Sequence, residues 1–374
     1  MKLGKPGTGL STGLSRHCNK ARFVVFLFLL GCMLLLAGCA GRKKEMHAEG
    51  EMQQEASGFV GSRGNGEGTG KRKVHVWAVY WDNEDVVRRM ENLQEDVDGI
   101  SYFAAYFDSE KKMFLPENVM GMKAAIENSG KNGKMESYLT FVNDLLKKEG
   151  GSSLKDKDLL YYLFSSKESR QRHISDILEM TEQGGFDGVE IDYEAMKKDM
   201  ELWKLFTSFV NELYGKTSER GLKLRVILEP GAPVEELGFV KGPEYVFMCY
   251  NLYGYGTEPG PKADENFLIS MVEKGKALPG ETYFAVANGG FDFIKASGET
   301  EQISTEEAIL RQSQAGDNKA IRRDEKSGCK VYSYRDSNGR EHEVWYADDE
   351  TLNFWYGILE REGAKGLSLW RLGG

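Results

Sequence analysis

Apolar runs of strand length recur along residues 73–374, and the stretches between them carry apolar residues at helical spacing. In the segment Asp199–Glu219, for example, Leu202, Phe206 and Phe209 follow one another at intervals of three or four residues, which is typical of an amphipathic helix. Strands that alternate with helices predict a parallel sheet, and eight such units predict a closed (β/α)8 TIM barrel, an α/β fold of about 250 residues. An open, doubly wound sheet is the alternative, but no glycine-rich phosphate loop follows the first run.

The predicted elements are spread along this region. Helices are predicted over Glu84–Gln94, Asp158–Gln183 and Asp199–Glu219. The eight predicted strands are Val74–Trp81, Ile100–Phe107, Ser137–Val142, Gly185–Tyr193, Leu222–Leu228, Tyr245–Tyr250, Thr282–Ala287 and Gly366–Trp370.

One stretch departs from this alternation, between the seventh predicted strand and the last helix. Within Cys329–Tyr346, two runs of alternating apolar residues flank Asn338-Gly339, and Asn-Gly between such runs is a strong β-hairpin signal. We therefore expect a hairpin inserted into the barrel domain, projecting above the barrel mouth as part of a groove wall. The alternative is a loop without a functional role.

Residues 1–38 have the layout of a secretory signal rather than of a folded element. They contain five basic residues and no acidic residue, and an apolar run extends over Phe23–Leu36, as in signal peptides. Residues 39–72 are rich in Gly, Glu, Lys and Ser and nearly devoid of apolar side chains. They predict a flexible tether, because such a stretch cannot bury enough surface to fold. Residues 73–374 then form the folded domain.

The run Leu36-Ala37-Gly38-Cys39 resembles the bacterial lipobox, which implies that Cys39 is the lipid-bearing first residue of the mature chain. We expect the folded domain to lie outside the cytoplasmic membrane and to be anchored to it by this lipid. The alternative is an uncleaved membrane anchor formed by the apolar run, which predicts the same location.

Charge and composition exclude several classes of function. The formal net charge is −9, and removal of the five basic residues of the signal leaves about −14, whereas nucleic-acid binding needs a basic footprint. Cys249 and Cys329 are the cysteines left beyond Cys39, so no disulfide framework is predicted. The histidines stand at positions 17, 47, 75, 173 and 342, without the spacing of metal ligands. We expect neither a metal nor a cofactor.

The fourth predicted strand carries the candidate chemistry. Val189 and Ile191 alternate there with Glu190, Asp192 and Glu194, so three carboxyl groups project from one face and apolar residues from the other. Like charges this close cannot all ionise at neutral pH, so at least one pKa rises and supplies a proton donor. The alternative, a solvated strand at a sheet edge, fits poorly with the Gly-Gly-Phe-Asp-Gly sequence that precedes it.

Together, Asp187, Gly188, Glu190, Asp192 and Glu194 resemble the signature of glycoside hydrolase family 18, the chitinase family, whose fourth barrel strand reads Asp-Gly-x-Asp-x-Asp-x-Glu. One position departs, since Glu190 stands where the family usually has Asp. The resemblance implies a TIM barrel with its site at the carboxyl ends of the strands.

The resemblance also implies roles for the acids. Glu194 is the general acid that protonates the glycosidic oxygen, and Asp192 holds and polarises the substrate's 2-acetamido group. That group's oxygen attacks the anomeric carbon and forms an oxazolinium ion, with net retention. Glu190 lies deeper, where it either shares a proton with Asp192 or is an interior acid satisfied by hydroxyl groups.

Met248-Cys249-Tyr250-Asn251 resembles the Met-x-Tyr-Asp of the family's sixth strand. It implies that the Tyr250 hydroxyl stabilises the oxazolinium ion and that Met248 lines the barrel beneath. Asn251 replaces a frequent Asp, which removes a negative charge near the acid and should lower the pKa of that acid.

Further residues fall at the barrel mouth. Trp370 matches the family's eighth-strand Trp, which implies a floor for the sugar at the cleavage point. Tyr80, Trp81 and Asn143 end predicted strands and line the groove in this interpretation, with packing as the alternative.

These residues predict a retaining, substrate-assisted hydrolase of β-1,4 bonds next to N-acetylglucosamine. The pattern Tyr-x-Asp-x-x-Gly-x-x-His-Glu-Val-Trp of the hairpin resembles the spore-cortex and cell-wall hydrolases of the family, and this favours peptidoglycan. Chitin oligosaccharides and host N-glycans remain open as substrates. A non-catalytic, lectin-like lipoprotein on the same barrel is the alternative function, and a two-lobed solute-binding lipoprotein is a third that the eight-unit pattern disfavours.

Overall fold

The computed structural model describes residues 73–92, 97–129, 135–314 and 320–373. The predicted signal peptide (1–38), Cys39 and the predicted tether (39–72) lie outside the described residues, so their assignments stay predictions. Within the described ranges, no helix combines the length and the apolar composition that crossing a membrane requires.

Eight parallel strands close into a barrel, which confirms the predicted (β/α)8 TIM fold. Neighbouring strands follow the order β2-β1-β15-β9-β8-β7-β6-β4, and the pairing of β2 with β4 closes the ring. A short β3 (Met113–Phe114) pairs antiparallel with the end of β2, and β5 comprises Ser152–Ser153. The barrel strands are β1 (Lys73–Val79), β2 (Gly99–Phe107), β4 (Glu136–Leu146), β6 (Gly188–Asp192), β7 (Lys223–Leu228), β8 (Glu244–Met248), β9 (Thr282–Ala287) and β15 (Gly366–Leu372).

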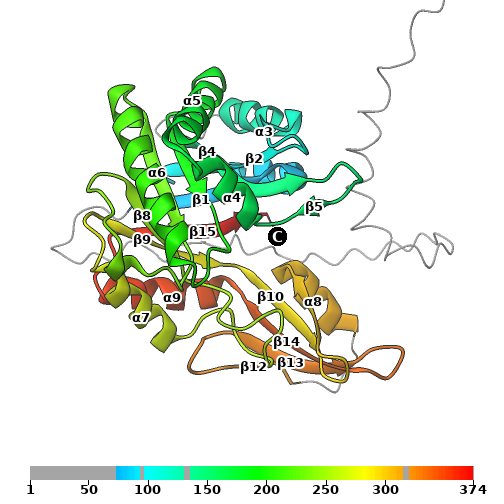
Figure 1. Cartoon of the computed structure of the whole chain (residues 1–374). Coiled ribbons are helices and arrows are strands. Elements are labelled where there is room, and N and C mark those ends of the chain that lie inside the picture. The colour runs from blue at the N-terminus through cyan, green and yellow to red at the C-terminus, as the bar shows by residue number, and fades with distance from the viewer. Residues whose placement is uncertain (1–72, 93–96, 130–134, 315–319, 374) are drawn as a thin grey trace, which may run out of the picture. The chain divides into compact units, whose positions relative to one another are not determined.

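Helices pack against the outside of the barrel (Figure 1). The helical segment predicted over Asp158–Gln183 forms two helices, because the chain breaks at Ser165-Ser166 into α4 and α5. Ser166 caps the second helix: its hydroxyl accepts a hydrogen bond from the Ser169 N–H at 3.0 Å, a favourable N-cap. The helices are α2 (Asn83–Asn92), α3 (Glu117–Asn128), α4 (Lys157–Phe164), α5 (Lys167–Gln183), α6 (Met200–Glu219), α7 (Glu265–Gly275) and α9 (Asp349–Arg361), with short 3-10 turns η1 (Tyr80–Asp82) and η2 (Val234–Glu236).

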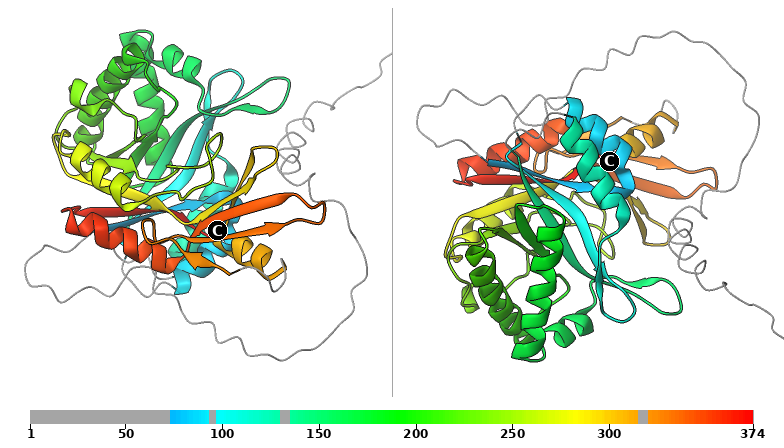
Figure 2. Two further views of the ribbon diagram at one scale, coloured as in Figure 1. Left: turned by 90° about the horizontal axis from the view of Figure 1, so that it is seen from below. Right: turned by 90° about the horizontal axis from the view of Figure 1, so that it is seen from above.

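A second, antiparallel sheet is inserted between β9 and α9. Its strand order is β11-β10-β14-β13-β12, and β13 and β14 form the predicted hairpin around Asn338-Gly339. The sequence did not indicate that three more strands and a helix accompany this hairpin. In the views of Figures 1 and 2 the orange hairpin and the green helices α5 and α6 lie on different sides of the barrel. The elements are β10 (Gly289–Ile294), β11 (Glu299–Ile303), α8 (Thr305–Gln314), β12 (Arg322–Arg323), β13 (Lys330–Arg335) and β14 (Glu341–Ala347).

The apolar core has two layers, as alternation along barrel strands requires. Outward-facing strand residues such as Val189 and Ile191 pack with the helices in the larger layer. Inward-facing residues fill the barrel with a smaller cluster that includes Trp77, Phe103 and Met248. The inner cluster reaches the carboxyl ends of the strands, where it supports the candidate site.

Candidate active site

The acidic residues of β6 lie on the inner face of the barrel. Val189 and Ile191 belong to the outer core, whereas Glu190 contacts side chains from β1, β2, β4 and β7 inside the barrel. Asp192 follows on the same face, and Glu194 lies two residues beyond it, past the end of β6. These positions fall at the carboxyl ends of the strands, where TIM barrels hold their sites.

The first two residues of the signature fix the strand in place. Asp187 Oδ2 accepts hydrogen bonds from the N–H and the hydroxyl of Ser137, at 2.8 and 2.7 Å. Gly188 is needed because a Cβ at this position would lie 2.6 Å from the ring of Tyr138. Asp187 and Gly188 therefore attach the start of β6 to β4 and set the register of the acids that follow.

Glu190 is completely buried, and protein groups satisfy its carboxylate. Oε1 accepts from Trp77 Nε1 at 2.6 Å and from Thr140 Oγ1 at 2.8 Å, and Oε2 accepts from Ser101 Oγ at 2.7 Å. The fourth partner is Arg225, whose Nε lies 3.0 Å from Oε2. Glu190 therefore has no exposed surface with which to touch a glycan, and this geometry corresponds to the alternative of an interior acid.

Arg225 balances the charge of Glu190 inside the barrel. Its guanidinium also donates to Glu244 at 2.8 Å and to the Ser368 hydroxyl at 3.2 Å. A buried ion pair persists only when its remaining donors and acceptors are satisfied, and this pair meets that condition.

Lys155 joins the two acids at the mouth. Its ammonium contacts Glu194 Oε1 and lies 3.6 Å from Asp192 Oδ2. Lys155 has a left-handed backbone with φ of 54°, and its N–H donates to Asp144 Oδ1 at 2.8 Å. Its loop follows β4, so adjacent strands of the barrel supply the acids and the cation.

The charges and burial of this group shift the pKa of Asp192 upward. Burial raises the pKa of Asp192 well above its usual range, the Lys155 ammonium opposes this rise, and the charges of Glu194 and Glu190 add to it. Burial lowers the pKa of Lys155, but the carboxylates of Asp192 and Glu194 outweigh it and raise that pKa overall. At least one raised carboxyl pKa was expected, and Asp192 has it.

Two side chains hold the backbone around Glu194. Asn143 is fully buried: its Oδ1 accepts from the Glu194 N–H at 3.0 Å, and its Nδ2 donates to the Glu194 carbonyl at 3.2 Å. Glu229 Oε2 accepts from the N–H of Ala195 at 3.0 Å. The structure thus places Asn143 behind the acid rather than along the groove.

Tyr250 and Met248 lie on the inner face at the end of β8, in the cluster that fills the barrel. Burial raises the pKa of Tyr250 well above its usual range, and the nearby charges of Asp192 and Glu194 add to this rise. Tyr250 therefore keeps its proton and can donate a hydrogen bond toward the acids.

The aromatic residues predicted at the mouth form a connected group. The half-buried Trp370 ring packs edge-on against Phe103 and Trp77, with centroids 5.0 and 6.0 Å away. Tyr80 packs against Tyr106 at 6.3 Å, also edge to face. Asn251 is exposed and has a left-handed backbone with φ of 61°. The structure therefore brings Asp192, Glu194, Tyr250, Met248 and Trp370 to one end of the barrel, with Tyr80 and Asn251 further out.

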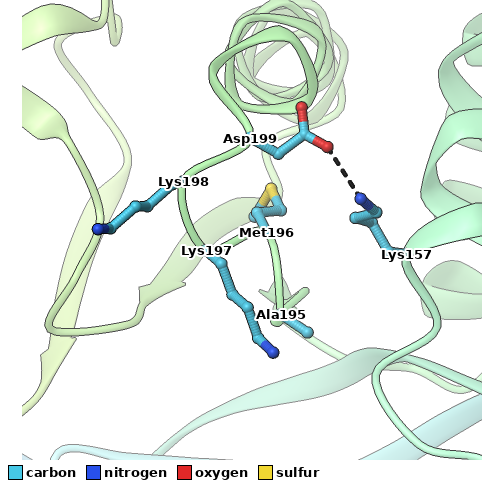
Figure 3. Close-up of a pocket in the computed structure, with 6 residues that line it drawn as sticks. All are labelled: Lys157, Ala195, Met196, Lys197, Lys198 and Asp199. Atoms are coloured by element: carbon cyan, nitrogen blue, oxygen red, sulfur yellow. Dashed lines mark hydrogen bonds and ion pairs between the residues drawn. The ribbon is translucent and has the colours of Figure 1, made fainter.

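An open pocket of about 390 Å³ begins directly beyond the acid. Figure 3 shows its lining: the turn from Ala195 to Asp199, together with Lys157 at the start of α4. Lys157 points to Asp199 and pairs with it at 3.1 Å. Lys197 and Lys198 extend from the turn in different directions and are exposed.

Sequence reasoning missed Arg225, Lys155 and Glu229. A signal existed for Arg225, because a charged residue at an inward position of the apolar strand Leu222–Leu228 needs a buried partner. Lys155 lies in a polar loop, and nothing in its surroundings in the sequence separates it from other lysines.

Within the described ranges, no group of three or more His, Cys, Asp or Glu side chains could hold a metal ion. Cys249 and Cys329 are free and buried, and burial raises the pKa of both thiols.

A TIM barrel with a pair of carboxyl groups at the carboxyl ends of its strands is an arrangement that glycosidases use. The family model of glycosyl hydrolases family 18 matches residues 76–374, and the chain belongs to this family. Among curated proteins it is similar to the cortical fragment-lytic enzyme of Bacillus subtilis (strain 168), with 22% identity over 235 residues, 56% of this chain and 52% of that protein.

Solved structures show the same fold. The Bacillus cereus spore cortex-lytic enzyme SleL matches with a TM-score of 0.65 and 17% identity, over 82% of this chain and 72% of that one. The chitinase from Chromobacterium violaceum ATCC 12472 matches with a TM-score of 0.67 and 16% identity, over 81% of this chain and 95% of that chitinase. The chain spans about half to two thirds of the length of the curated relatives that it matches.

Proposed function

We propose that this protein is a retaining glycoside hydrolase that cleaves β-1,4 bonds next to N-acetylglucosamine, with the substrate's own 2-acetamido group as nucleophile. Glu194 gives its proton to the glycosidic oxygen as the bond to the anomeric carbon breaks. The acetamido oxygen attacks that carbon and forms an oxazolinium ion. Glu194 then takes a proton from the water that opens this ion. Two successive inversions at the anomeric carbon retain its configuration.

The observation that carries this proposal is the state of Asp192. Within the described part of the chain, its Oδ1 atom is buried without a hydrogen-bond partner. A buried polar atom left in this state costs about 1–3 kcal/mol, and a substrate amide N–H that donates to it would remove that cost. Asp192 lies two residues before Glu194, so the same substrate would place its acetamido group on one side chain and its glycosidic oxygen near the other.

Tyr250 supplies the second contact to the acetamido group. Its hydroxyl stays protonated because of burial and the neighbouring acids, and it would donate to the acetamido oxygen as charge develops there. Trp370 offers an apolar ring face at the same end of the barrel, which suits the C–H face of a sugar ring. Asn143 acts through the backbone of Glu194 and is a positioning residue.

The substrate we propose is peptidoglycan or a chitin-like glycan outside the cell. The similarity to a cortical fragment-lytic enzyme and to a chitinase supports both choices. The predicted lipid anchor at Cys39 favours the cell wall, because it would hold the domain at the membrane surface.

The test is glycan cleavage by the full chain, with a Glu194→Gln variant beside it. N-acetylglucosamine oligomers and peptidoglycan strands are incubated in parallel, and products are identified by mass spectrometry. We expect cleavage with N-acetylglucosamine at the new reducing end and a loss of at least about 100-fold in the variant, since proton transfer contributes this much. Binding of either glycan without cleavage would contradict the proposal and establish the lectin-like alternative.

A further inference from the structure

The positively charged ammonium of Lys155 lies beside Asp192 and Glu194, the two carboxylates that the proposed reaction uses. Its loop position is fixed by the backbone hydrogen bond to Asp144, while its side chain is 27% exposed. A lysine ammonium has three donors at the end of a flexible stem. The ammonium can therefore change partners without any movement of the loop.

The contact with Glu194 opposes the proposed reaction in one respect. A general acid must reach the glycosidic oxygen, whereas the ammonium of Lys155 occupies the Glu194 Oε1 atom. Glu194 is free to meet the substrate when Lys155 finds another partner. A carboxylate on the substrate is such a partner, because it replaces one charge-assisted hydrogen bond with another.

Lys155 itself lies among the carboxylates of Asp144, Asp192 and Glu194. The neighbouring pocket, however, contains several lysines, although the chain as a whole carries a net charge of −9. The pocket that begins one residue after Glu194 is lined by Lys157, Lys197 and Lys198 (Figure 3). Within the described residues, Lys197 and Lys198 form no ion pair. A glycan that enters the site therefore meets uncompensated positive charge beside the acid.

We propose that Lys155 is a specificity-determining residue: it pairs with Glu194 in the free protein and transfers to a carboxylate on the substrate. The site thereby selects N-acetylated glycans that carry carboxylates over neutral ones, and the lysines of the adjacent pocket hold further carboxylates of the same strand. This inference rests on the proposed function and deepens it by naming the class of substrate.

The experiment compares peptidoglycan strands that carry free carboxylates with the same strands after amidation. The full chain should hydrolyse the free strands with a kcat/KM about 10-fold higher, the size of one charge-assisted hydrogen bond. Lys155→Met should abolish this preference and raise kcat on the amidated strands, because Glu194 no longer pairs with an ammonium. Lys155→Arg keeps the charge and should keep the preference.

The control is Lys241→Met, which removes an exposed lysine just before β8, at the opposite end of the barrel strands. It should leave both rates unchanged. Equal losses of kcat/KM on both substrates in Lys155→Met would show that Lys155 has a structural role, and this would overturn the inference. An unchanged preference for the free strands in this variant would also overturn it.

A failure of the proposed function would give a different experimental result from a failure of this inference. If the wild-type chain cleaves neither glycan, calorimetric binding of the two strands decides the question. If the wild-type chain binds the free strands more tightly than the amidated strands, and Lys155→Met abolishes this difference, the carboxylate site is still supported. Equal binding of both strands would refute it.

Discussion

Glu190 and Arg225 form an ion pair in the interior of the barrel, and both side chains are almost completely buried, with exposures of 0 and 1%. Moving two charges out of water is costly, and their mutual attraction offsets this only when every other donor and acceptor is satisfied. Trp77, Ser101 and Thr140 meet this requirement for the carboxylate. The pair and these three partners therefore connect five strands of the barrel, β1, β2, β4, β6 and β7, directly beneath the proposed site.

Removal of one partner should be much more damaging than removal of an exposed pair. Arg225→Met leaves the charge of Glu190 buried and unpaired, so we expect a loss of about 3–5 kcal/mol in the free energy of unfolding. Urea denaturation monitored by circular dichroism measures this loss. The double variant Arg225→Met with Glu190→Gln should regain part of it, because no buried charge remains.

Arg220→Met is the matched control. Arg220 pairs with Glu182 on the surface, where the two side chains are 41 and 47% exposed, and such pairs contribute at most about 1 kcal/mol. Similar losses for Arg220→Met and Arg225→Met would contradict the role assigned to the buried pair.

The same contrast between residues explains what the sequence could predict about the site. The alternation of Val189 and Ile191 with the acids follows from strand geometry alone, and it correctly placed Glu190 inside the barrel. The partner of Glu190 was out of reach because Arg225 lies 35 positions away, on the next strand. Lys155 reaches Glu194 through a left-handed loop conformation that a polar segment does not reveal.

At the scale of elements, Asp292 connects the parts of the inserted sheet. This side chain of β10 is 1% exposed. Its Oδ1 lies 2.8 Å from His342 Nδ1 on β14, and its Oδ2 accepts from Tyr334 on β13 and Arg311 on α8, both at 2.6 Å. One carboxylate thus attaches a helix and both strands of the hairpin to β10.

Asp292→Ala should loosen the insertion while the barrel stays folded. The variant leaves the buried His342 ring without its hydrogen-bond acceptor, and it removes one of the carboxylates that pair with Arg311. Each buried polar group left without a partner lowers the stability of the insertion by about 1–3 kcal/mol. We expect faster amide hydrogen exchange in β13 and β14, with little change in β6 and β7. Exchange measured by mass spectrometry distinguishes these segments.

Glu341→Gln provides the comparison for this prediction. Glu341 lies on the same hairpin, and its ion pairs with Lys295 and Arg335 are exposed, so its loss should change exchange little. Equally fast exchange in both variants would show that Asp292 does not hold the insertion together.

The elements differ in how far the sequence determines them. The eight barrel strands were predictable because each is a separate apolar run, and the hairpin because Asn338-Gly339 between two alternating runs is a strong hairpin signal. The rest of the insertion was not predicted, since β11 is exposed along most of its length and β12 has two residues. The break between α4 and α5 depends on a single serine cap in a continuous helical pattern.

At the scale of the whole molecule, the predicted tether limits where the barrel can act. A flexible segment covering residues 39–72 would have an end-to-end distance on the order of 30 Å. A lipid at Cys39 would then confine the domain to the glycan nearest the membrane.

We predict that the mature chain begins at a lipidated Cys39. In bacterial cells supplied with labelled fatty acid, the wild-type chain should incorporate label, and its intact mass should lack residues 1–38. Cys39→Ser should incorporate none and retain residues 1–38, because the lipid attaches to the thiol. Fractionation alone would not decide this, since the apolar run Phe23–Leu36 would hold an unprocessed chain in the membrane.

Cys32→Ser is the control for this experiment, because it removes a thiol from the signal segment and leaves Cys39 in place. It should be labelled and cleaved like the wild type, since the lipobox pattern singles out Cys39. A wild-type chain that keeps residues 1–38 and carries no lipid would contradict the prediction. The apolar run would then be an uncleaved anchor, and the tether would extend from the end of that run at Leu36 to β1.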